Sequence, residues 1–246
     1  MKLIALIPHY NHIGTVGQVV QTLKDMDIDC LIIDDGSDEI VKPVLQQLQT
    51  QNVMVIYRAI NGGKGAAVKD GMKYASKHGY THALQVDADA QHCLADTEKL
   101  IALACENPQA VICARPLYGD DAPKTRLYGR KISNFWMVIN TLSFDIKDGM
   151  CGFRIYPLNL TIDIVRNEYL GNYMDFDIEL LVKLHRHGAQ FMWIDTPVTY
   201  AAEGISHFRA WHDNMLISWM HARLFAGMLF RAPKILWSKW QRGAHD

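Results

Sequence analysis

The sequence predicts an α/β fold with a mostly parallel central sheet flanked by helices. Short apolar runs of strand length alternate with longer segments whose apolar residues recur at helical spacing. Such a succession is typical of parallel strands joined by right-handed helical crossovers. Polar residues also follow several of the apolar runs directly, as expected where ligands bind at the carboxyl edge of such a sheet.

Five apolar runs in the first half are expected to be strands. They are Leu3 to Ile7, Cys30 to Ile33, Asn52 to Tyr57, Tyr80 to Val86 and Ala110 to Ala114. Helices are expected between them: one with Val16, Val19, Val20 and Leu23 on one face, one ending near Leu48, Gly65 to His78, and about Asp96 to Glu106.

The second half is expected to add helices and closing strands. The segments are an apolar helix from Ile132 to Phe144, a turn and strand from Asp148 to Tyr156, a helix from Tyr173 to His187, and strands at Phe191 to Ile194 and Val198 to Ala201. From Trp211 onward, aromatic and basic residues interleave, which is typical of an interfacial helix, and Pro233 should break it into two pieces. A core-packing helix or a dimer contact is the alternative.

Composition indicates one domain with an appended tail. The 246 residues, 49% of them hydrophobic and 21% charged, can bury one substantial core, which we expect over residues 1–208, with a basic amphipathic tail over 209–246. A net charge of −1 argues against a general nucleic-acid binder. Five scattered cysteines without a C-x-x-C pair, no signal-peptide pattern and no membrane span together predict a cytoplasmic protein.

The acidic centre of the chain is the stretch ALQVDADAQH, residues 83–92. Asp87, Asp89 and Gln91 follow an apolar strand, and carboxylates separated by one residue can address one divalent cation. An oxygen-rich set suits Mg²⁺ or Mn²⁺, which share their shell with substrate phosphates. A polar turn whose aspartates cap the next helix is the alternative.

Three further polar groups stand at expected strand ends or helix starts. Pro8, Tyr10 and Asn11 follow the first strand, and Asp35 follows the second. Lys64 lies in a glycine-rich turn before a helix, where the helix N-terminus and the lysine both favour an anion. The turn is not a Walker loop, because the G-x-x-x-x-G-K-[ST] order is absent.

This combination resembles the family 2 glycosyltransferases of the GT-A fold, and among them the polyprenyl-phosphate (dolichol-phosphate) sugar synthases. The matching motifs, spread over roughly residues 2–208, are IPHYN, IIDDGSD, NGGKGAA, VDADAQH, DGMCGFRIY and FDIELLVKLHRHG. The resemblance implies that Pro8 and Tyr10 border the nucleotide base and that Asp35 accepts a hydrogen bond from it. It also implies that Asp87 lies near the ribose, that Asp89 and Gln91 hold the metal on the diphosphate, and that the reaction inverts the anomeric carbon.

The chemistry of sugar transfer agrees with those roles. Negative charge grows on the departing diphosphate, which a metal on Asp89 and the positive charge of Lys64 can stabilise. An aspartate at position 35 suits a ring that presents N–H donors, which favours a UDP or GDP donor.

Basic residues of the second half are expected to bind the acceptor. Arg126, Arg130 and Lys131 lie in a segment that forms the acceptor loop in the resembled synthases, and Arg154 follows in DGMCGFRIY. Mobile basic residues beside a site can clamp a phosphate, although a solvated basic face is the commoner arrangement. Cys151 stands where the family usually has serine or threonine.

The candidate catalytic acids are Asp177, Glu179 and Asp148. In many inverting family members an acid at the 177–179 position serves as general base for a sugar hydroxyl, whereas a phosphate acceptor is already anionic and needs none. Acids in a first helical turn also simply complement the helix dipole. In the loop from Glu203 to Arg209, Glu203 and His207 replace basic residues of the family, and His207 is a further possible metal ligand.

The sequence therefore predicts a metal-dependent inverting glycosyltransferase that moves a sugar from a UDP- or GDP-sugar to a lipid-linked or other membrane-localised acceptor. The tail predicts reversible contact with an anionic membrane surface, placing the protein on the inner face of the cell membrane. A nucleotidyltransferase that makes nucleotide sugars and a non-catalytic nucleotide-sugar-binding module are the alternatives.

Overall fold

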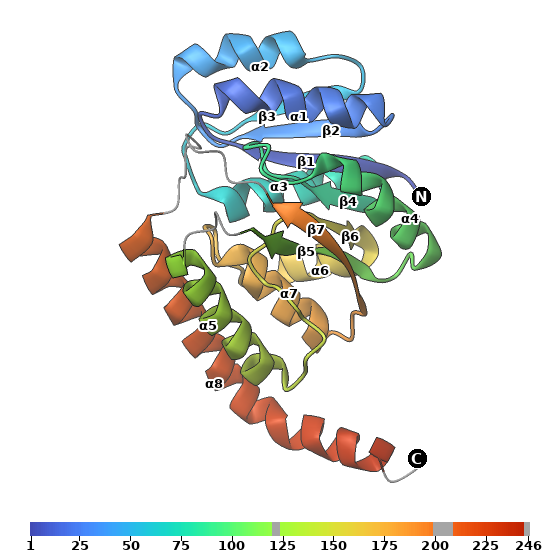
Figure 1. Ribbon diagram of the computed structural model, residues 1–246, viewed down its shortest axis with the longest axis vertical. Helices are drawn as coiled ribbons and strands as arrows, with labels where there is room; N and C mark the ends of the chain where they lie inside the picture. The colour runs from blue at the N-terminus through green and yellow to red at the C-terminus, as the bar shows by residue number, and fades with distance from the viewer. Residues whose placement is uncertain (120–123, 199–208, 244–246) are drawn as a thin grey trace.

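The computed structural model describes residues 1–119, 124–198 and 209–243. Within them the chain forms one sheet in the order β3-β2-β1-β4-β6-β5-β7 (Figure 1). Its strands are β1 (Leu3–His9), β2 (Asp29–Asp34), β3 (Val53–Tyr57), β4 (His82–Gln85), β5 (Val111–Tyr118), β6 (Arg154–Pro157) and β7 (Phe191–Val198). The predicted α/β fold with a mostly parallel sheet is confirmed.

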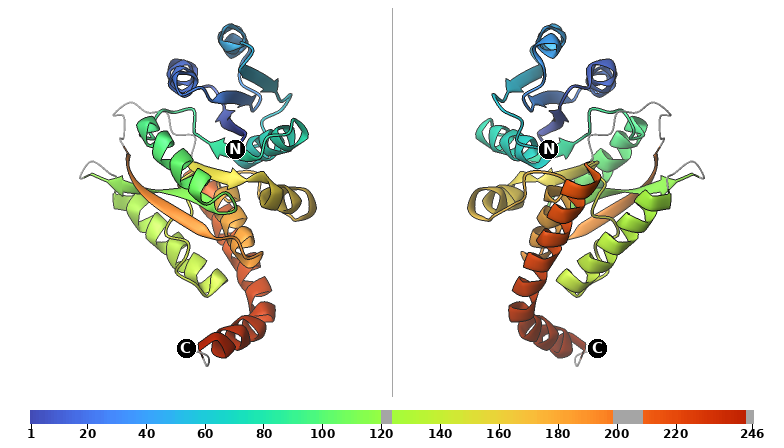
Figure 2. Two further views of the ribbon diagram at one scale, coloured as in Figure 1. Left: turned by 90° about the vertical axis from the view of Figure 1, so that its right-hand side faces the viewer. Right: turned by 90° about the vertical axis from the view of Figure 1, so that its left-hand side faces the viewer.

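Helices cover both faces of the sheet (Figures 1 and 2). They are α1 (Ile13–Asp25), α2 (Lys42–Leu48), α3 (Lys64–Lys77), α4 (Thr97–Glu106), α5 (Lys124–Thr141), α6 (Leu158–Asn167), α7 (Phe176–Arg186) and α8 (Ala210–Gly243), with short 3₁₀ turns at Glu39–Val41 and Leu94–Asp96. One buried cluster unites α1, α2 and α4 with one face of the sheet. The other unites α3, α6, α7 and the buried side of α8 with the opposite face.

The first four strands run parallel, which brings their carboxyl ends to one edge. His9 at the end of β1 stands beside Asp34 at the end of β2, and Leu6 of β1 stands beside Gln85 of β4. The polar residues that follow these strands therefore emerge together, as the sequence pattern predicted.

β6 is the exception in direction, because it pairs antiparallel with both β4 and β5. The chain enters β6 from the segment 148–153, at the same edge where β4 and β5 end. This reversal places the DGMCG turn next to the acidic centre.

The sheet closes with one long edge strand instead of the two short strands predicted. β7 pairs with β5 continuously from Val111–Phe191 to Tyr118–Val198. Pro197 is accommodated in β7 because β7 is the last strand of the sheet, where proline is tolerated. Residues 199–201 of the predicted second strand lie outside the described residues.

The two helices of the second half also differ from the prediction. α5 begins at Lys124, eight residues before the expected start, because its polar first turns continue the same helix that packs against α8. α8 stays helical through Pro233 and changes direction in its lower part (Figure 1). Its residues Ile217, Met220, Leu224 and Met228 are buried, so much of the predicted tail packs on the body of the protein.

Candidate active site

A large cleft opens at the carboxyl edge of β1, β2 and β4. Its volume is about 1230 Å³, above the 300–1,000 Å³ of ordinary small-molecule sites, so it has room for two substrates. Its lining combines the first-half residues Pro8, Tyr10, Asp35, Lys64, Asp87, Asp89, Gln91 and Tyr118 with the second-half residues Arg130, Cys151, Tyr173, Arg209 and Asn214.

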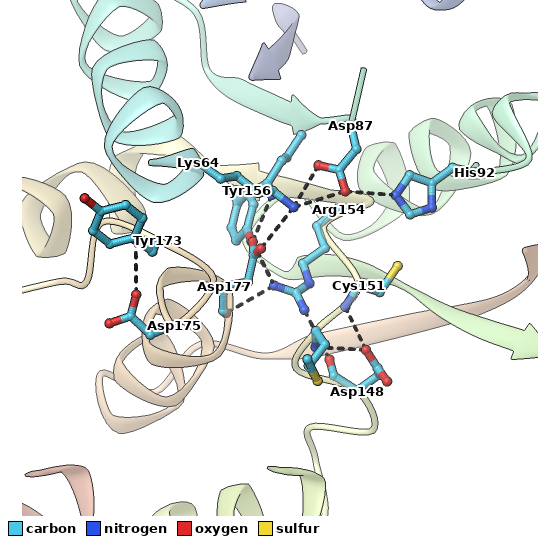
Figure 3. Close-up of polar contacts among 12 residues, drawn as sticks. Lys64, Asp87, His92, Asp148, Cys151, Arg154, Tyr156, Tyr173, Asp175 and Asp177 are labelled. Carbon is cyan, nitrogen blue, oxygen red and sulfur yellow. Dashed lines mark hydrogen bonds and ion pairs between the residues drawn. The ribbon is translucent and has the colours of Figure 1, made fainter. Parts of the chain in front are cut away.

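Lys64 lies between two carboxylates on the floor of this cleft (Figure 3). Its ammonium is 2.7 Å from Asp87 Oδ1 and 3.2 Å from Asp177 Oδ2. Burial alone would lower the pKa of Lys64, but Asp177 and Asp87 outweigh it and raise that pKa above its usual value. The lysine is therefore a fixed positive charge at neutral pH.

Asp87 stays ionised because the neighbouring positive charge favours its carboxylate form. Burial acts to raise its pKa, but Lys64 and His92 outweigh burial and hold the pKa well below its usual range. His92 Nε2 lies 3.5 Å from Asp87 Oδ2, and the His92 ring stacks on Phe153. The Lys64–Asp87 ion pair is thus set in place before any ligand arrives.

Asp177 is held beneath Lys64 at the start of α7. Gln85 Nε2 donates to Asp177 Oδ1 at 2.8 Å, and the fully buried Arg154 donates to the backbone oxygen of Asp177 at 3.2 Å. Arg154 also donates to the backbone oxygen of Asp148 and to the Tyr156 hydroxyl, both at 3.2 Å (Figure 3). Arg154 therefore ties two acid-bearing segments together instead of facing the cleft.

Glycines allow this cluster and its surroundings to approach closely. A Cβ at Gly152 would lie 2.7 Å from Gln85 Nε2 and 2.8 Å from Lys64 Nζ. Gly63 has a φ of +93°, and a Cβ there would meet the Asn172 backbone oxygen at 2.5 Å. A Cβ at Gly65 would collide with Phe176 of α7. The glycine-rich turn and α7 are consequently in direct contact.

This geometry is accompanied by a sequence match. The model of the family described as "Glycosyl transferase family 2" matches residues 4–164. The chain belongs to glycosyl transferase family 2. This confirms the family that the motifs predicted.

Several proteins similar to this family 2 glycosyltransferase have names that refer to sugar transfer involving polyprenyl or dolichyl phosphates. It is 23% identical to a polyprenol monophosphomannose synthase of Mycolicibacterium smegmatis, over 81% of the chain and 77% of the relative. It is 22% identical to an undecaprenyl-phosphate mannosyltransferase of Micrococcus luteus, over 81% of the chain and 84% of the relative.

A solved structure establishes the fold type. Glucosyl-3-phosphoglycerate synthase of Mycobacterium tuberculosis, in complex with Mn²⁺, UDP and glucosyl-3-phosphoglycerate, aligns with a TM-score of 0.65 at 12% identity, over 94% of this chain and 79% of that one. The fold of this family 2 glycosyltransferase is therefore GT-A.

Asp35 anchors the glycine-rich turn. Its carboxylate accepts hydrogen bonds from the backbone N–H of Gly62 at 3.0 Å and of Gly63 at 2.7 Å, and it pairs with Arg58. A carboxylate has about four acceptor positions, so one remains for a further donor. Asn11 instead lies outside the cleft lining, where its side chain donates to Asp38.

Asp89 and Gln91 have the chemistry of a shared metal site. Burial, followed by the charge of Asp87, raises the pKa of Asp89, so a cation here would relieve a repulsion between carboxylates. Within residues 1–119, 124–198 and 209–243, no three His, Cys, Asp or Glu side chains gather as a complete metal site. Oxygen donors in an incomplete set fit Mg²⁺ or Mn²⁺ that completes its shell on a diphosphate. His207 lies outside the described residues.

The predicted acceptor residues take several positions. Arg130 lines the cleft, beside the ring of Tyr118. One of its guanidinium nitrogens donates to both carboxylate oxygens of Asp148, at 2.6 and 2.7 Å. Burial alone would lower the pKa of Arg130, but Asp148 raises it overall. Lys131 is exposed next to Tyr128. The side chain of Arg126 lies outside the described residues.

Glu179 lies on a different side of α7 from Asp177. It is fully buried, accepts from the Gly171 N–H at 2.9 Å and pairs with Arg223 of α8 at 2.8 Å. It does not line the cleft, and neither does Asp148, whose carboxylate also accepts from the Cys151 N–H at 2.8 Å. Through these contacts, Glu179 connects α7 to α8, and Asp148 connects α5 to the turn before β6.

Sequence reasoning left out several cleft residues. Tyr173 lines the cleft beneath the guanidinium of Arg209, 5.2 Å from the ring centre, and His212 meets the ring edge-on. Gln85, which is buried and holds Asp177 without lining the cleft, was also left out, although a polar residue inside an apolar strand run is a local signal. Tyr173 and Arg209 meet through folding alone, 36 residues apart in the sequence.

Proposed function

We propose that this family 2 glycosyltransferase transfers a sugar from a UDP- or GDP-sugar to a lipid-linked acceptor of the polyprenyl-phosphate type, or to another membrane-localised acceptor. The observation that carries the proposal is the position of Lys64. It is a permanent positive charge between Asp87 and Asp177, on the floor of a cleft beside Asp89. A diphosphate leaving group needs such a charge where its own negative charge develops.

The donor occupies the first-half side of the cleft. Pro8 and Tyr10 border the base, Asp35 accepts from it, and Asp87 lies near the ribose, while Asn11 supports this loop from outside the lining. Asp89 and Gln91 would hold Mg²⁺ or Mn²⁺, which when bound would supply Lewis-acid stabilisation to the diphosphate. Lys64 adds a second positive charge from the protein.

The reaction inverts the anomeric carbon. An acceptor oxygen approaches that carbon from the side opposite the diphosphate and forms the new bond. The bond to the diphosphate oxygen breaks, and its electron pair departs with the nucleoside diphosphate. Lys64 stabilises this departing charge, and the cleft holds both reactants in line.

The bonding of Asp177 supports an anionic acceptor. Both of its carboxylate oxygens already have partners, Gln85 on one and Lys64 on the other. A carboxylate held in this way is poorly available to remove a proton, and a phosphate acceptor requires no base. Arg130 and Lys131 provide positive charge on the acceptor side, and Asp177 remains the candidate base if the acceptor is a hydroxyl.

The test is transfer measured with matched acceptors. Purified protein is incubated with UDP-glucose, UDP-N-acetylglucosamine or GDP-mannose and a short-chain polyprenyl phosphate, with Mn²⁺ or with EDTA. We expect a glycosylated lipid phosphate from at least one donor, and no product with the corresponding unphosphorylated polyprenol or in EDTA.

Two other results would replace this proposal. Formation of a nucleotide sugar from a nucleoside triphosphate and a sugar phosphate would establish a nucleotidyltransferase. Tight nucleotide-sugar binding without turnover of any acceptor would establish a binding module.

We place the enzyme on the cytoplasmic face of the membrane, bound from one side. Among the described residues, none of the helices combines the length and the apolar character that crossing a bilayer requires. Contact by surface binding matches the basic composition of the last 40 residues.

A further inference from the structure

The exposed sides of α5 and α8 carry several large apolar side chains. In α8, the exposed residues between positions 211 and 230 are Trp211, Asn214, Met215, Ser218, Trp219, Ala222, Ala226, Leu229 and Phe230, and none is charged. In α1, by contrast, the exposed positions include Gln18, Gln21 and Asp25. The hydrophobic pattern of α8 therefore extends to both its inner and its outer sides.

α5 adds a second apolar row. Tyr128, Ile132 and Phe135 recur at helical spacing and are 67%, 61% and 63% exposed. The opposite side of α5 is occupied, because Trp136 contacts Phe225 of α8 with 5.9 Å between ring centres. We call these three residues, together with Trp211, Met215, Trp219, Leu229 and Phe230, the α5/α8 outer face.

The two rows belong to one surface of the molecule. α5 and α8 run side by side along the outside of α7 (Figures 1 and 2). Their contacts with each other use Ser133, Trp136 and Asn140 of α5 and His221 and Phe225 of α8. Both exposed rows lie away from these contacts and from the buried residues beneath, so they face outward together.

The upper end of this face adjoins the cleft. Gly129, Arg130 and Ser133 of α5 line the cleft, and so do Asp213, Asn214 and Ile217 of α8. The exposed Tyr128 and Met215 are immediate neighbours of these lining residues in the sequence. An apolar surface is thus continuous with the acceptor side of the site.

The Lys and Arg residues of α5 and α8 favour a negatively charged partner for the α5/α8 outer face. α5 contains four Lys or Arg residues and no acid, while α8 contains five, and its only acid, Asp213, is buried. Arg130 and Arg223 are already paired with Asp148 and Glu179, whereas Lys131 and Arg231 are exposed next to Ile132 and Phe230 in the sequence. A second copy of the chain packed through a two-fold axis would bring these like charges together. An anionic lipid surface supplies the compensating charge, and tryptophan and tyrosine suit its headgroup region.

We propose that the α5/α8 outer face docks on an anionic lipid bilayer, so that the cleft opens beside the headgroups of the leaflet. The inference rests on the proposed function, and it names the surface through which a lipid acceptor reaches the site. It assigns docking to the exposed rows of two helices packed on the protein body and not to the last turns of α8 alone.

The test is flotation of the full-length protein with vesicles of 30% phosphatidylglycerol in phosphatidylcholine, or of phosphatidylcholine alone. We expect binding to the anionic vesicles at 50 mM salt, several-fold weaker binding at 500 mM salt, and little binding to the neutral vesicles. Protein that stays unbound to the anionic vesicles at both salt concentrations overturns the proposal.

Variants locate the binding surface. Met215, Trp219 and Phe135 are 66%, 67% and 63% exposed, so M215Q/W219Q/F135Q is expected to fold normally and to lose at least about tenfold in vesicle affinity. Ile40 is 74% exposed in the 3₁₀ turn Glu39–Val41 that leads into α2, and α2 lies far from α5 and α8 in Figure 1. Ile40→Gln is therefore the matched control and should bind like the parent. Unfolding is checked by circular dichroism, and the single variant Trp219→Gln, expected to lose several-fold, serves if the triple variant is unstable.

Two outcomes assign the surface differently and overturn the proposal. If the triple variant binds like the parent while full-length W237Q/W240Q does not, the last turns of α8 dock alone. If light scattering shows that the parent is a dimer and the triple variant a monomer, the face joins two copies of the chain.

Failure of docking and failure of the proposed function are distinguishable. Sugar transfer to a short-chain, water-dispersed polyprenyl phosphate requires the cleft but no bilayer, so the triple variant should retain it and lose transfer to a long-chain acceptor in vesicles. Vesicle binding without transfer to either acceptor would leave the docking face standing and remove the proposed reaction.

Discussion

The two sides of the cleft are constructed differently. On the donor side, Asp35, Asp87 and Asp89 each follow the end of a parallel strand, so the sheet itself sets their positions. On the acceptor side, Arg130 and Tyr173 come from a helix and a loop that reach the cleft through packing between α5, α7 and α8. A position at a strand end can be recognised in the sequence, because the polar residue directly follows an apolar run. A position set by helix packing has no such local pattern.

The charged side chains on the two sides also differ in how far they are already paired within the protein. Asp89 on the donor side has a single backbone partner, the Gln91 N–H at 3.1 Å, and its carboxylate is open to a cation. Arg130 on the proposed acceptor side is already paired with Asp148, so a phosphate bound there would have to compete with that carboxylate. We therefore expect substitutions on the donor side to cost more activity than those on the acceptor side.

The largest effect is expected at the metal site. Asp89→Asn removes a carboxylate from the candidate Mg²⁺ or Mn²⁺ site and should lower kcat/KM by about a thousandfold or more. Calorimetric titration with UDP or GDP should show loss of the Mn²⁺-dependent part of nucleotide affinity. Asp25→Asn, at an exposed position of α1, is the control. Full activity of Asp89→Asn, or of the parent in EDTA, would reject the metal assignment.

A smaller loss of activity is expected from replacing Lys64, which lies between the donor and acceptor sides of the cleft. Lys64→Met removes the fixed positive charge near the leaving group and should lower kcat by about a hundredfold, with less change in KM. The control is Lys73→Met, which removes a half-exposed lysine from the same helix. Equal kinetic losses in both variants would show that Lys64 acts only through the stability of α3.

Replacing Asp35 tests whether its carboxylate contacts the nucleobase or only supports the glycine-rich turn. Asp35→Ala should weaken nucleoside diphosphate binding by about 1–3 kcal/mol. If the carboxylate accepts from a ring N–H, discrimination between bases should fall as well, measured by thermal shift with UDP, GDP, CDP and ADP. An equal loss for all four would assign Asp35 to anchoring Gly62 and Gly63, and unchanged affinity for every nucleotide would remove both roles.

The last prediction concerns the pH dependence of stability at the α5–α8 contact and not activity. Burial lowers the pKa of His221 to about 4, and its ring lies between Ser133 and Asn140 of α5. An unfolded histidine has a pKa of about 6.5, so acidification below that value protonates the unfolded chain preferentially. Stability should therefore fall by up to about 1.4 kcal/mol per pH unit between pH 6.5 and 4.

The measurement is denaturant unfolding of the parent and of His221→Gln across that range. Other groups titrate in both proteins, so the difference between the two curves isolates His221. We expect a shallower decline in the variant, and parallel curves would contradict a buried neutral histidine.

The sequence predicted the donor side well because its motifs are local. Each polar cluster follows an apolar run of strand length, and parallel topology brings such ends to one edge without further information. The two acids of α7 show where this reasoning ends. Asp177 and Glu179 are two positions apart, so a helix points them in different directions, but only the folded chain identifies which direction meets Lys64 and which meets Arg223.

The second half was harder to predict for the same reason. Pairing of Glu179 with Arg223 and of Arg130 with Asp148 depends on how helices and loops pack, and no local spacing encodes it. The reversed direction of β6 was also absent from the periodicity, because a short apolar run reads the same in either orientation. The helical segment from 210 was recognised as unusual, but its composition did not separate buried from exposed apolar residues.

The contact between the glycine-rich turn and α7 limits how this enzyme can be recombined. Neither Gly63 nor Gly65 leaves space for a Cβ against Asn172 and Phe176, although these residues are separated by more than 100 positions. A chimera that takes its nucleotide-binding half from one relative and its acceptor half from another must inherit both surfaces as a matched pair. Exchange of these two parts should therefore yield active hybrids only between parents that share this glycine-to-aromatic contact.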